Sequence, residues 1–253
     1  MVTNAALLAA AVSLVMAGGC SSDSTANLLD LSRTIDGSSL PLGQGNIRSW
    51  VRLGRGGSVT AIGVTFGEAA LAGLPAVSKE YLLTLPAEAA STPFKEIAVN
   101  WQANGHPPPG IFDKPHFDFH FYMMDENGRN AVVPSNAATI QQAPAPELVP
   151  KDYVADPYFV PRSGVHYTDP TTPEFHGQPF TQDFIYGFAF AKMAFVEPMV
   201  TTAYLATKPQ FSAALKLPQS YSPTGLYYPT SYAITYDGSK QEYTVSLEGM
   251  TIR

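Results

Sequence analysis

The chain contains a single cysteine, Cys20, among its 253 residues. One cysteine excludes a disulfide framework and any zinc module built from several cysteines. Charged residues are also scarce, at 14% against roughly 25% in an average soluble domain, and the formal net charge is −6. This acidic balance argues against a nucleic-acid partner and against a basic patch that binds membrane lipids.

Long helical and long hydrophobic segments are missing as well. The 22 prolines interrupt any sustained heptad pattern. The uncharged apolar run at residues 5–16 is too short to span a bilayer. Hydrophobic residues still make up 45% of the chain and aromatic residues 11%, so it can form a folded core and disorder is disfavoured.

The apolar run has the length of the hydrophobic region of an export signal, and small residues lead from it to Cys20. This arrangement resembles a bacterial lipoprotein signal, in which the cysteine is lipidated and becomes the mature N-terminus. Two departures are that no Lys or Arg precedes the run and that Met16 lies one place before the usual large aliphatic residue. An ordinary secretory signal or a misplaced start codon is the alternative reading.

We therefore predict three parts. Residues 1–19 form a lipoprotein signal peptide, residues 20–46 the lipidated Cys20 with a flexible tether, and residues 47–253 a single β-rich domain with a possible sub-boundary within 134–161. The protein is expected to be exported and anchored to the cell envelope. Membrane contact is through the N-terminal lipid only. Ser21 after the cysteine indicates the outer membrane if the organism has one.

Short runs rich in β-branched and aromatic residues recur along the mature chain, which predicts an all-β fold with minor helix. A β-sandwich or a jelly-roll-like barrel with long Pro-rich loops fits this spacing. Hairpins are predicted around residues 54–57 and around Asp237-Gly238, and a mostly extended loop at residues 132–161. The expected strands are 47–53, 58–66, 81–85, 94–101, 116–124, 184–190, 193–196, 231–236 and 241–247.

The strongest alternation lies at residues 116–122, His-Phe-Asp-Phe-His-Phe-Tyr. A strand would place His116, Asp118 and His120 on one face and three phenylalanines on the other. Ionisable groups in a row would be costly in a dry core, whereas a cleft with a metal ion or a polar ligand would accommodate them.

Further ligands must come from elsewhere, because residues four apart on a strand are about 13 Å apart and share one ion only if the strand bends. His106, His166 and Glu197 are candidates, as is Glu174, while Asp118 can act as a ligand or as a partner that orients an imidazole. Histidine and carboxylate ligands suit a divalent transition metal (Zn, Mn, Fe, Ni or Cu) and do not choose among these metals. His176, beside a glycine, is expected to lie on the surface.

The motif from Gly105 to Tyr122 reads GHxPPGxxDxPHFDxHFY. It resembles the signature of a family of exported bacterial proteins, classed as a domain of unknown function, that includes a ring-forming Thermus protein. The resemblance covers residues 45–250 and implies a β-rich structure and a possible homo-oligomer, but no activity. A looser similarity to the cupins rests on Gly110, His116 and His120, and on residues 161–166, and implies a metal inside a jelly-roll-like barrel.

Three readings of the histidine strand remain open. In the first, a lipid-anchored envelope protein holds a metal with His116, His120 and His166, helped by His106 or Glu197, and acts on a small-molecule ligand. In the second, a non-enzymatic envelope protein for assembly or ligand binding uses the His/Asp row as a structural hydrogen-bond network. In the third, the same cavity is a metal-free site. The sequence leaves open whether the protein is an enzyme.

Overall fold

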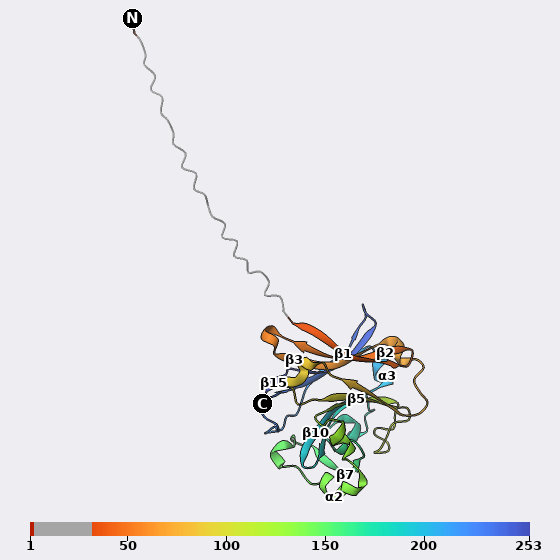
Figure 1. The fold of residues 1–253 in the computed structure, drawn as a ribbon. Helices are drawn as coiled ribbons and strands as arrows, with labels where there is room; N and C mark the ends of the chain where they lie inside the picture. The colour runs from red at the N-terminus through yellow and green to blue at the C-terminus, as the bar shows by residue number, and fades with distance from the viewer. Residues whose placement is uncertain (3–31) are drawn as a thin grey trace. The chain divides into compact units, whose positions relative to one another are not determined.

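The structure is a computed structural model that describes residues 1–2 and 32–253 (Figure 1). Residues 3–19 of the predicted signal peptide, and Cys20 with residues 21–31 of the predicted tether, lie outside the described residues. Ser32–Arg253 form one compact unit.

Two antiparallel sheets contain most of the strands. The six-stranded sheet has the order β1-β2-β3-β14-β13-β11, and the seven-stranded sheet has the order β4-β5-β6-β10-β9-β8-β7. The strands of the first sheet are β1 (Arg33–Leu42), β2 (Gly45–Leu53), β3 (Val59–Gly67), β11 (Gln210–Ala214), β13 (Ser231–Asp237) and β14 (Glu242–Glu248). Those of the second are β4 (Lys79–Thr84), β5 (Glu96–Gln102), β6 (His116–Tyr122), β7 (Val154–Val160), β8 (Gly164–Thr168), β9 (Gln182–Ala189) and β10 (Lys192–Thr201).

The remaining elements are short. Strands β12 (Tyr227–Tyr228) and β15 (Thr251–Ile252) form a separate pair. The α-helices are α1 (Glu126–Asn130), α2 (Ala137–Ile140) and α3 (Thr202–Leu205), and the 3-10 helices are η1 (Arg55–Gly57), η2 (Glu68–Leu71), η3 (Ala87–Ser91), η4 (Pro134–Asn136), η5 (Pro146–Leu148) and η6 (Pro173–His176). Among the described residues, no helix has both the length and the apolar character needed to cross a membrane.

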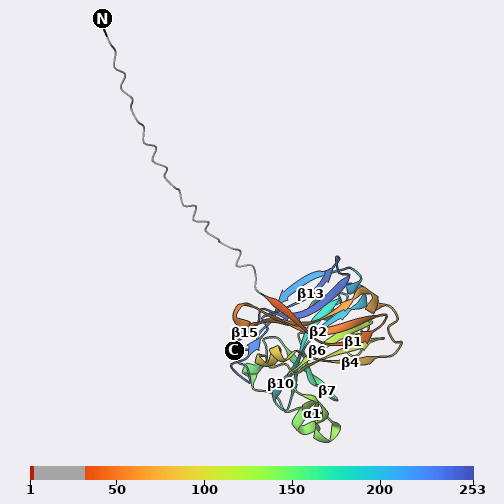
Figure 2. The same ribbon diagram turned by 45° about the horizontal axis from the view of Figure 1, so that its top comes forward.

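The main core lies between the two sheets, which pack as a sandwich (Figures 1 and 2). Phe66 from β3 stacks on Phe119 and Tyr243, and Phe117 packs against Trp101. Alternate residues of each strand point into this layer, as two-sheet packing requires. The predicted all-β class is confirmed in its sandwich form, and the sheets do not close into the barrel that was the other expectation.

The predicted hairpins around residues 54–57 and Asp237-Gly238 are confirmed by the β2–β3 and β13–β14 pairings. Two segments need correction. Residues 33–42, assigned to the flexible tether, form strand β1, which pairs with β2 across a register shift between Asp36 and Ser39. Its serine, glycine and proline residues are typical of loops, so the sequence predicted a tether here. Edge strands tolerate these residues better than central strands do.

The second correction concerns residues 132–161, predicted to be mostly extended loop. They contain η4, α2, η5 and edge strand β7, with α1 just before them. Pro134 and Pro146 lie in the first turn of their helices, where the missing N–H costs no hydrogen bond. Pro157 lies in β7, where the pairing with β8 shifts between Ala155 and Phe159. Figure 2 shows α1 and β7 in the same part of the molecule.

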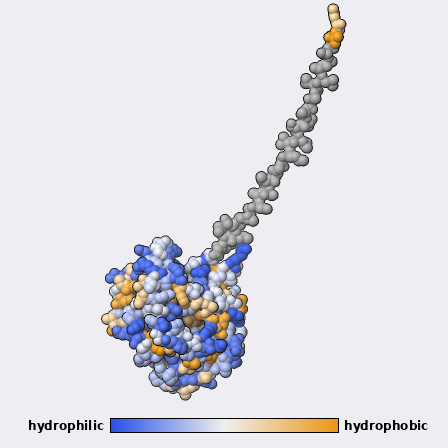
Figure 3. Space-filling model, turned by 180° about the vertical axis from the view of Figure 1, so that it is seen from behind, coloured by the Kyte–Doolittle hydropathy of each residue, from blue (hydrophilic) through white to orange (hydrophobic). Residues whose placement is uncertain are grey.

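The face seen in Figure 3 has small apolar patches separated by hydrophilic residues. Exposed large apolar side chains of the sandwich include Val77, Val154, Tyr158 and Ile252. Scattered apolar residues of this kind are normal on a protein surface.

Candidate metal-binding site

Strand β6 separates phenylalanine from histidine as its alternation predicts. Phe117, Phe119 and Phe121 are fully buried in the core between the sheets. His116, Asp118 and His120 lie on the opposite face of the seven-stranded sheet and are also buried, with exposed fractions of 0%, 1% and 5%. This outer face is therefore covered, and its polar groups are withdrawn from bulk water.

The cover encloses a cavity of about 170 Å³ over the middle of the sheet. Residues from β5, β6, β7, β8, β9 and β10 and from the loop before β6 line it. They are Asn100, Gln102, His106, Pro107, Phe112, Asp118, His120, Asp156, Tyr158, Val160, Ser163, His166, Thr168, Ile185 and Glu197. The predicted cleft beside the histidine strand is thus present, and it has the size for a small molecule.

Strand order brings distant residues to this cavity. The pairings of Val196 with Phe121 and of Met199 with Asp118 place Glu197 beside His120 on neighbouring strands. On the far side of β10, Glu197 pairs with Ile185 of β9. His166 pairs with Gly187, two residues further along β9, so it reaches the same face of the sheet.

The ligand atoms form two groups rather than one. His106, His116 and Asp118 offer three atoms that lie within 4.8 Å of one another, and His120, His166 and Glu197 offer three more. His116 and His120 belong to different groups, so the predicted set of His116, His120 and His166 does not form around one point among the described residues. The strand does not bend enough to let residues four apart converge. We call them the first group (His106, His116, Asp118) and the second group (His120, His166, Glu197).

The first group has its imidazoles oriented by backbone carbonyls. The Nδ1 atom of His116 donates to the Lys114 carbonyl at 2.6 Å, and that of His106 to the Pro107 carbonyl at 2.7 Å. A carbonyl oxygen only accepts, so Nδ1 carries the hydrogen in both rings. Their Nε2 atoms face Asp118 Oδ1 at 2.8 Å for His116 and 3.6 Å for His106.

Asp118 is held in place from its other side. The side-chain amide of Gln102 donates to Asp118 Oδ2 at 2.9 Å. Oδ1 and the facing His116 Nε2 are buried and lack a hydrogen bond of acceptable geometry, although they are only 2.8 Å apart. Two imidazoles that are oriented by carbonyls and face one carboxylate oxygen have the arrangement of metal ligands once their Nε2 atoms carry no proton.

A local turn positions His106. Its backbone N–H donates to the Phe112 carbonyl, and Gly105 has a φ of +73°. A Cβ at Gly105 would lie 2.2 Å from the Phe112 oxygen, so only glycine fits there. The ring of His106 packs edge-on against His116 at 4.7 Å between centroids.

The second group is more deeply buried in apolar surroundings. The Nε2 atoms of His120 and His166 both lie 3.4 Å from Glu197 Oε2, which has no hydrogen-bond partner. The ring of Phe195 packs against both imidazoles, at 4.8 Å from His120 and 5.1 Å from His166. Gly187 leaves room for that ring, because a Cβ there would lie 2.0 Å from a Phe195 ring carbon.

Burial and neighbouring charges shift the pKa values of the two groups in opposite directions. Burial opposes charge on His106, but Asp118 outweighs it and raises the His106 pKa to about 9. Burial lowers the pKa of His120 to about 3 and that of His166 to about 4. Both imidazoles of the second group are therefore neutral near pH 7, as metal ligands must be.

The carboxyl groups differ in the same way. Burial disfavours the charge of Asp118, yet the electrostatic attraction and the hydrogen bonds of the neighbouring His116 and His106 rings hold the Asp118 pKa well below its usual range. Burial, followed by the charge of Asp118, raises the pKa of Glu197 well above its usual range. A buried carboxyl group of this kind holds a proton or faces a cation.

Sequence reasoning missed Asp156. It lies in β7 at the register shift, half-buried, and lines the cavity, and burial raises its pKa. Within the described part of the chain it makes no hydrogen bond or ion pair, and its nearest charged influences are His166 and His106, one from each group. The Asp156-Pro157 pair was a signal, because proline in an edge strand accompanies irregular pairing that redirects side chains.

Two other predicted residues lie outside this cavity. His176 is exposed at the end of η6, as expected. Glu174 is buried but lines another cavity, so it is not a ligand here.

The chain was compared with known families, curated proteins and solved structures. A family model described as "TTHB210-like: Hypothetical protein TTHB210" matches residues 54–101. Neither a curated protein nor a solved structure matches the chain significantly. The family match supports a relation to a Thermus protein of unknown function over η1 to β5. It ends before His106, so it reaches neither the histidine motif nor the residues of the cupin similarity.

Proposed function

We propose that this protein binds divalent transition metal ions in the histidine cavity and presents them to a small-molecule ligand. The observation that carries the proposal is the orientation of the first group. His106 and His116 each use Nδ1 to bond a backbone carbonyl, which leaves Nε2 of both rings facing Asp118 Oδ1. Metal-binding histidines are typically oriented in this way.

Each group consists of two imidazoles and one carboxylate. This donor set suits Zn, Mn, Fe, Ni or Cu, and three protein ligands leave coordination positions open for a ligand. A bound ion would supply a Lewis acid or a redox centre. Asp156, which faces both groups and has no partner among the described residues, would hydrogen-bond that ligand or accept a proton from it.

The alternative reading is a non-enzymatic envelope protein in which the His/Asp row is a structural hydrogen-bond network. Such a network stabilises a fold only when its buried members are satisfied. Here His120 Nδ1 and Glu197 Oε2 are buried without hydrogen-bond partners, whereas His116 Nε2 and Asp118 Oδ1 face each other at 2.8 Å. The unpartnered atoms of His120 and Glu197 favour the metal reading over the network.

Metal analysis of the purified protein, prepared without a polyhistidine tag, tests the proposal. We expect a stoichiometric transition metal, and a rise in unfolding temperature when metal is returned to chelated protein. His166→Gln should lose the contribution of the second group, whereas His176→Gln, at an exposed histidine, should behave as the wild type. Absence of stoichiometric metal, together with no thermal response to Zn²⁺ or Mn²⁺, would refute it.

We further propose that the protein is exported and anchored to the cell envelope by a lipid on Cys20, in the outer membrane if the cell is Gram-negative. The support is the apolar run and the small residues before the lone cysteine. Labelling of cells with a radioactive fatty acid tests this. We expect a labelled, membrane-associated protein for the wild type and an unlabelled one for Cys20→Ser. Equal labelling of both would contradict it.

A homo-oligomer stays a prediction from the family resemblance. Light scattering of the purified chain measures it directly.

A further inference from the structure

A second cavity, of about 210 Å³, lies where the start of β9 and helix η6 approach strands β11 and β13. It shares no lining residue with the histidine cavity. The acidic and amide side chains that line it are Asp169, Glu174, Gln182 and Asp183. The segment of η6 and the start of β9 thus bring several carbonyl and carboxylate oxygens together.

Asp183 is the feature that calls for an explanation. Its side chain is 4% exposed, and Oδ1 accepts a hydrogen bond from the N–H of Phe184 at 2.7 Å. Its other oxygen, Oδ2, is buried and has no hydrogen-bond partner. A buried carboxylate oxygen without a partner is costly, and native proteins rarely leave one in this condition.

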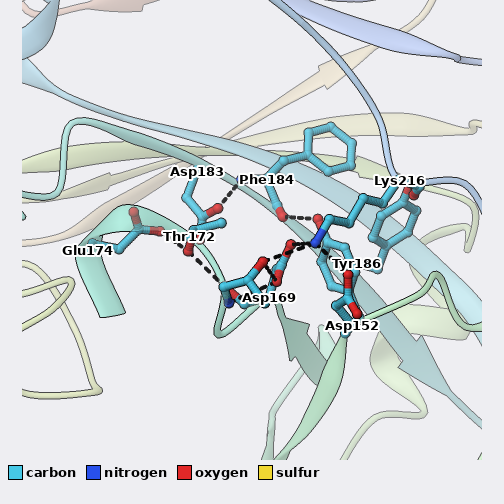
Figure 4. Close-up of polar contacts among 10 residues, drawn as sticks. Asp152, Asp169, Thr172, Glu174, Asp183, Phe184, Tyr186 and Lys216 are labelled. Carbon is cyan, nitrogen blue, oxygen red and sulfur yellow. Dashed lines mark hydrogen bonds and ion pairs between the residues drawn. The ribbon is translucent and has the colours of Figure 1, made fainter. Parts of the chain in front are cut away.

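The nearest ionisable neighbour of Asp183 is a second acidic residue, which adds to the cost of a negative charge there. Glu174, itself 7% exposed, lies within hydrogen-bonding reach of Asp183, and the two carboxyl groups repel each other when both are ionised. Glu174 Oε1 accepts from the Thr172 hydroxyl at 2.6 Å. Figure 4 shows the Asp183 and Glu174 side chains close to Thr172. Burial, followed by the charge of Glu174, raises the pKa of Asp183 well above its usual range.

The lysine near this cluster does not neutralise the pair. Lys216 Nζ contacts Asp169 Oδ2 at 2.5 Å and Asp152 Oδ2 at 2.8 Å. Figure 4 shows its ammonium group beside these two aspartates, and no contact line joins it to Asp183. Both carboxylate oxygens of Asp169 already have partners, because Oδ2 contacts Lys216 and Oδ1 accepts hydrogen bonds from the N–H and the hydroxyl of Thr171. The Asp183–Glu174 pair is therefore balanced either by a shared proton or by a positive charge that the described residues do not provide.

We propose that this cavity binds a hard divalent cation of the Ca²⁺ type through Asp183 Oδ2 and the Glu174 carboxylate. The oxygen donors around the pair include no imidazole and no thiolate, which suits Ca²⁺ rather than Zn²⁺ or Cu²⁺. Gln182 Oε1, which accepts from the Tyr232 hydroxyl, is a further oxygen on the same wall. The cavity has room for the water molecules that complete the shell of such an ion.

The proposed ion would tie two segments together. Glu174 belongs to η6, in the connection between β8 and β9, and Asp183 belongs to β9 itself. Binding would fix this connection against the sheet. The site is independent of the histidine cavity, so its failure would leave the proposed function untouched, and the reverse also holds.

Thermal unfolding of the chelated, full-length protein at pH 7.5 in a series of Ca²⁺ and Mg²⁺ concentrations tests the inference. We expect the unfolding temperature to rise by several degrees with millimolar Ca²⁺, with a dissociation constant on the order of 10⁻⁴–10⁻³ M, as in exported calcium modules. Asp183→Asn should weaken Ca²⁺ binding at least tenfold, and Glu174→Gln should weaken it too. Glu88→Gln, at an exposed residue outside both cavities, should respond to Ca²⁺ as the wild type.

The unfolding midpoint without added ions separates binding from folding. Asp183→Asn should unfold at or above the wild-type temperature, because it removes the unpartnered charge. Three results would overturn the inference. They are a wild type that does not respond to Ca²⁺, an unchanged response in Asp183→Asn, and a response that disappears in Glu88→Gln. If the wild type does not respond to Ca²⁺, the pH dependence of unfolding decides what balances the pair. A free energy of unfolding that falls as pH rises in the wild type, but not in Asp183→Asn, would show that the pair holds a proton.

Discussion

Replacement of Glu197 by glutamine separates metal binding from a structural network most sharply. Glu197 is 1% exposed, and its Oε2 lies 3.4 Å from the Nε2 atoms of His120 and His166 without a hydrogen bond to either. Glutamine has nearly the same shape but no charge, so the substitution changes the electrostatics of the second group with little change in packing. The two readings predict opposite effects on stability.

If the second group binds a metal, the chelated wild type carries an unsatisfied carboxyl group at this position. Chelated Glu197→Gln should then equal or exceed the wild type in free energy of unfolding. If the group is a network, the substitution breaks it and should cost roughly 1–3 kcal/mol. Urea unfolding of the two chelated proteins measures the difference.

The pH dependence of the chelated proteins has a definite sign. Burial raises the pKa of Glu197 in the folded chain above its ordinary value, so the folded state binds this proton more tightly than the unfolded state. Stability is therefore lost as pH rises from the ordinary carboxyl pKa through the raised one, by at most about 1.4 kcal/mol per pH unit. Glu197→Gln should lack this part of the slope.

Added metal should make the wild type more stable than Glu197→Gln, which is the reverse of the order expected for the chelated proteins. An ion at 100 times its dissociation constant stabilises a fold by about 2.7 kcal/mol, which is roughly 5–11 °C for a domain of this size. The second group should supply such a shift in the wild type and none in Glu197→Gln. Glu88→Gln, at an exposed residue, is the matched control. A chelated Glu197→Gln that is several kcal/mol less stable, with no metal response in the wild type, would refute the reasoning.

Three further predictions follow from neighbouring contacts. Gly187→Ala should displace the Phe195 ring, cost about 1–3 kcal/mol of stability and weaken metal affinity at the second group, measured by urea unfolding and metal titration. Arg129→Met leaves buried Glu96 without its 2.9 Å partner and should cost about 3–5 kcal/mol in urea unfolding. Metal affinity at the first group should rise about tenfold per pH unit up to about pH 9, because the metal must displace the proton that Asp118 stabilises on His106, whose pKa is raised to about 9. Calorimetry at pH 6.5, 7.5 and 8.5 measures this.

Each of these has a control. Gly67→Ala places a Cβ in open space and should leave both stability and metal affinity nearly unchanged. Arg52→Met removes a partly exposed ion pair with Glu248 and should cost no more than about 1 kcal/mol. Equal losses in the buried and the exposed variants would contradict the role of burial. A pH-independent affinity at the first group would contradict the proton displacement.

Local periodicity was enough to predict the faces of strand β6. The alternation of phenylalanine with polar residues predicts a core face and a lined cavity, and the structure has both. Local periodicity could not predict which residues of other strands lie next to the histidines of β6. Whether His120 meets Glu197 depends on β10 lying beside β6, and whether His166 joins them depends on β9 and β8 following in that order.

The missed elements have physical reasons of the same kind. Strands β1 and β7 lie at the edges of their sheets, where glycine, serine and proline are tolerated, so composition alone predicts loops there. Asp156 was overlooked because its segment was assigned to the loop. His116 and His120 lie four residues apart on β6 and belong to different groups, and local sequence does not determine which residues of other strands each of them meets.

The charge of the histidine cavity makes a bound cation the simplest account of its composition. The cavity holds three carboxyl groups, Asp118, Asp156 and Glu197, and none of its described lining residues is Lys or Arg. The positive charge closest to Asp118 comes from His106 and His116 only while these rings are protonated. The second group has no such proton, because the pKa values of His120 and His166 are lowered to about 3 and 4. In a chain with only 14% charged residues, three carboxyl groups lie in one small cavity, and the raised pKa values of Glu197 and Asp156 mean that these two hold protons unless a cation is bound. Neutral imidazoles beside them are suited to bind a metal ion that provides the positive charge.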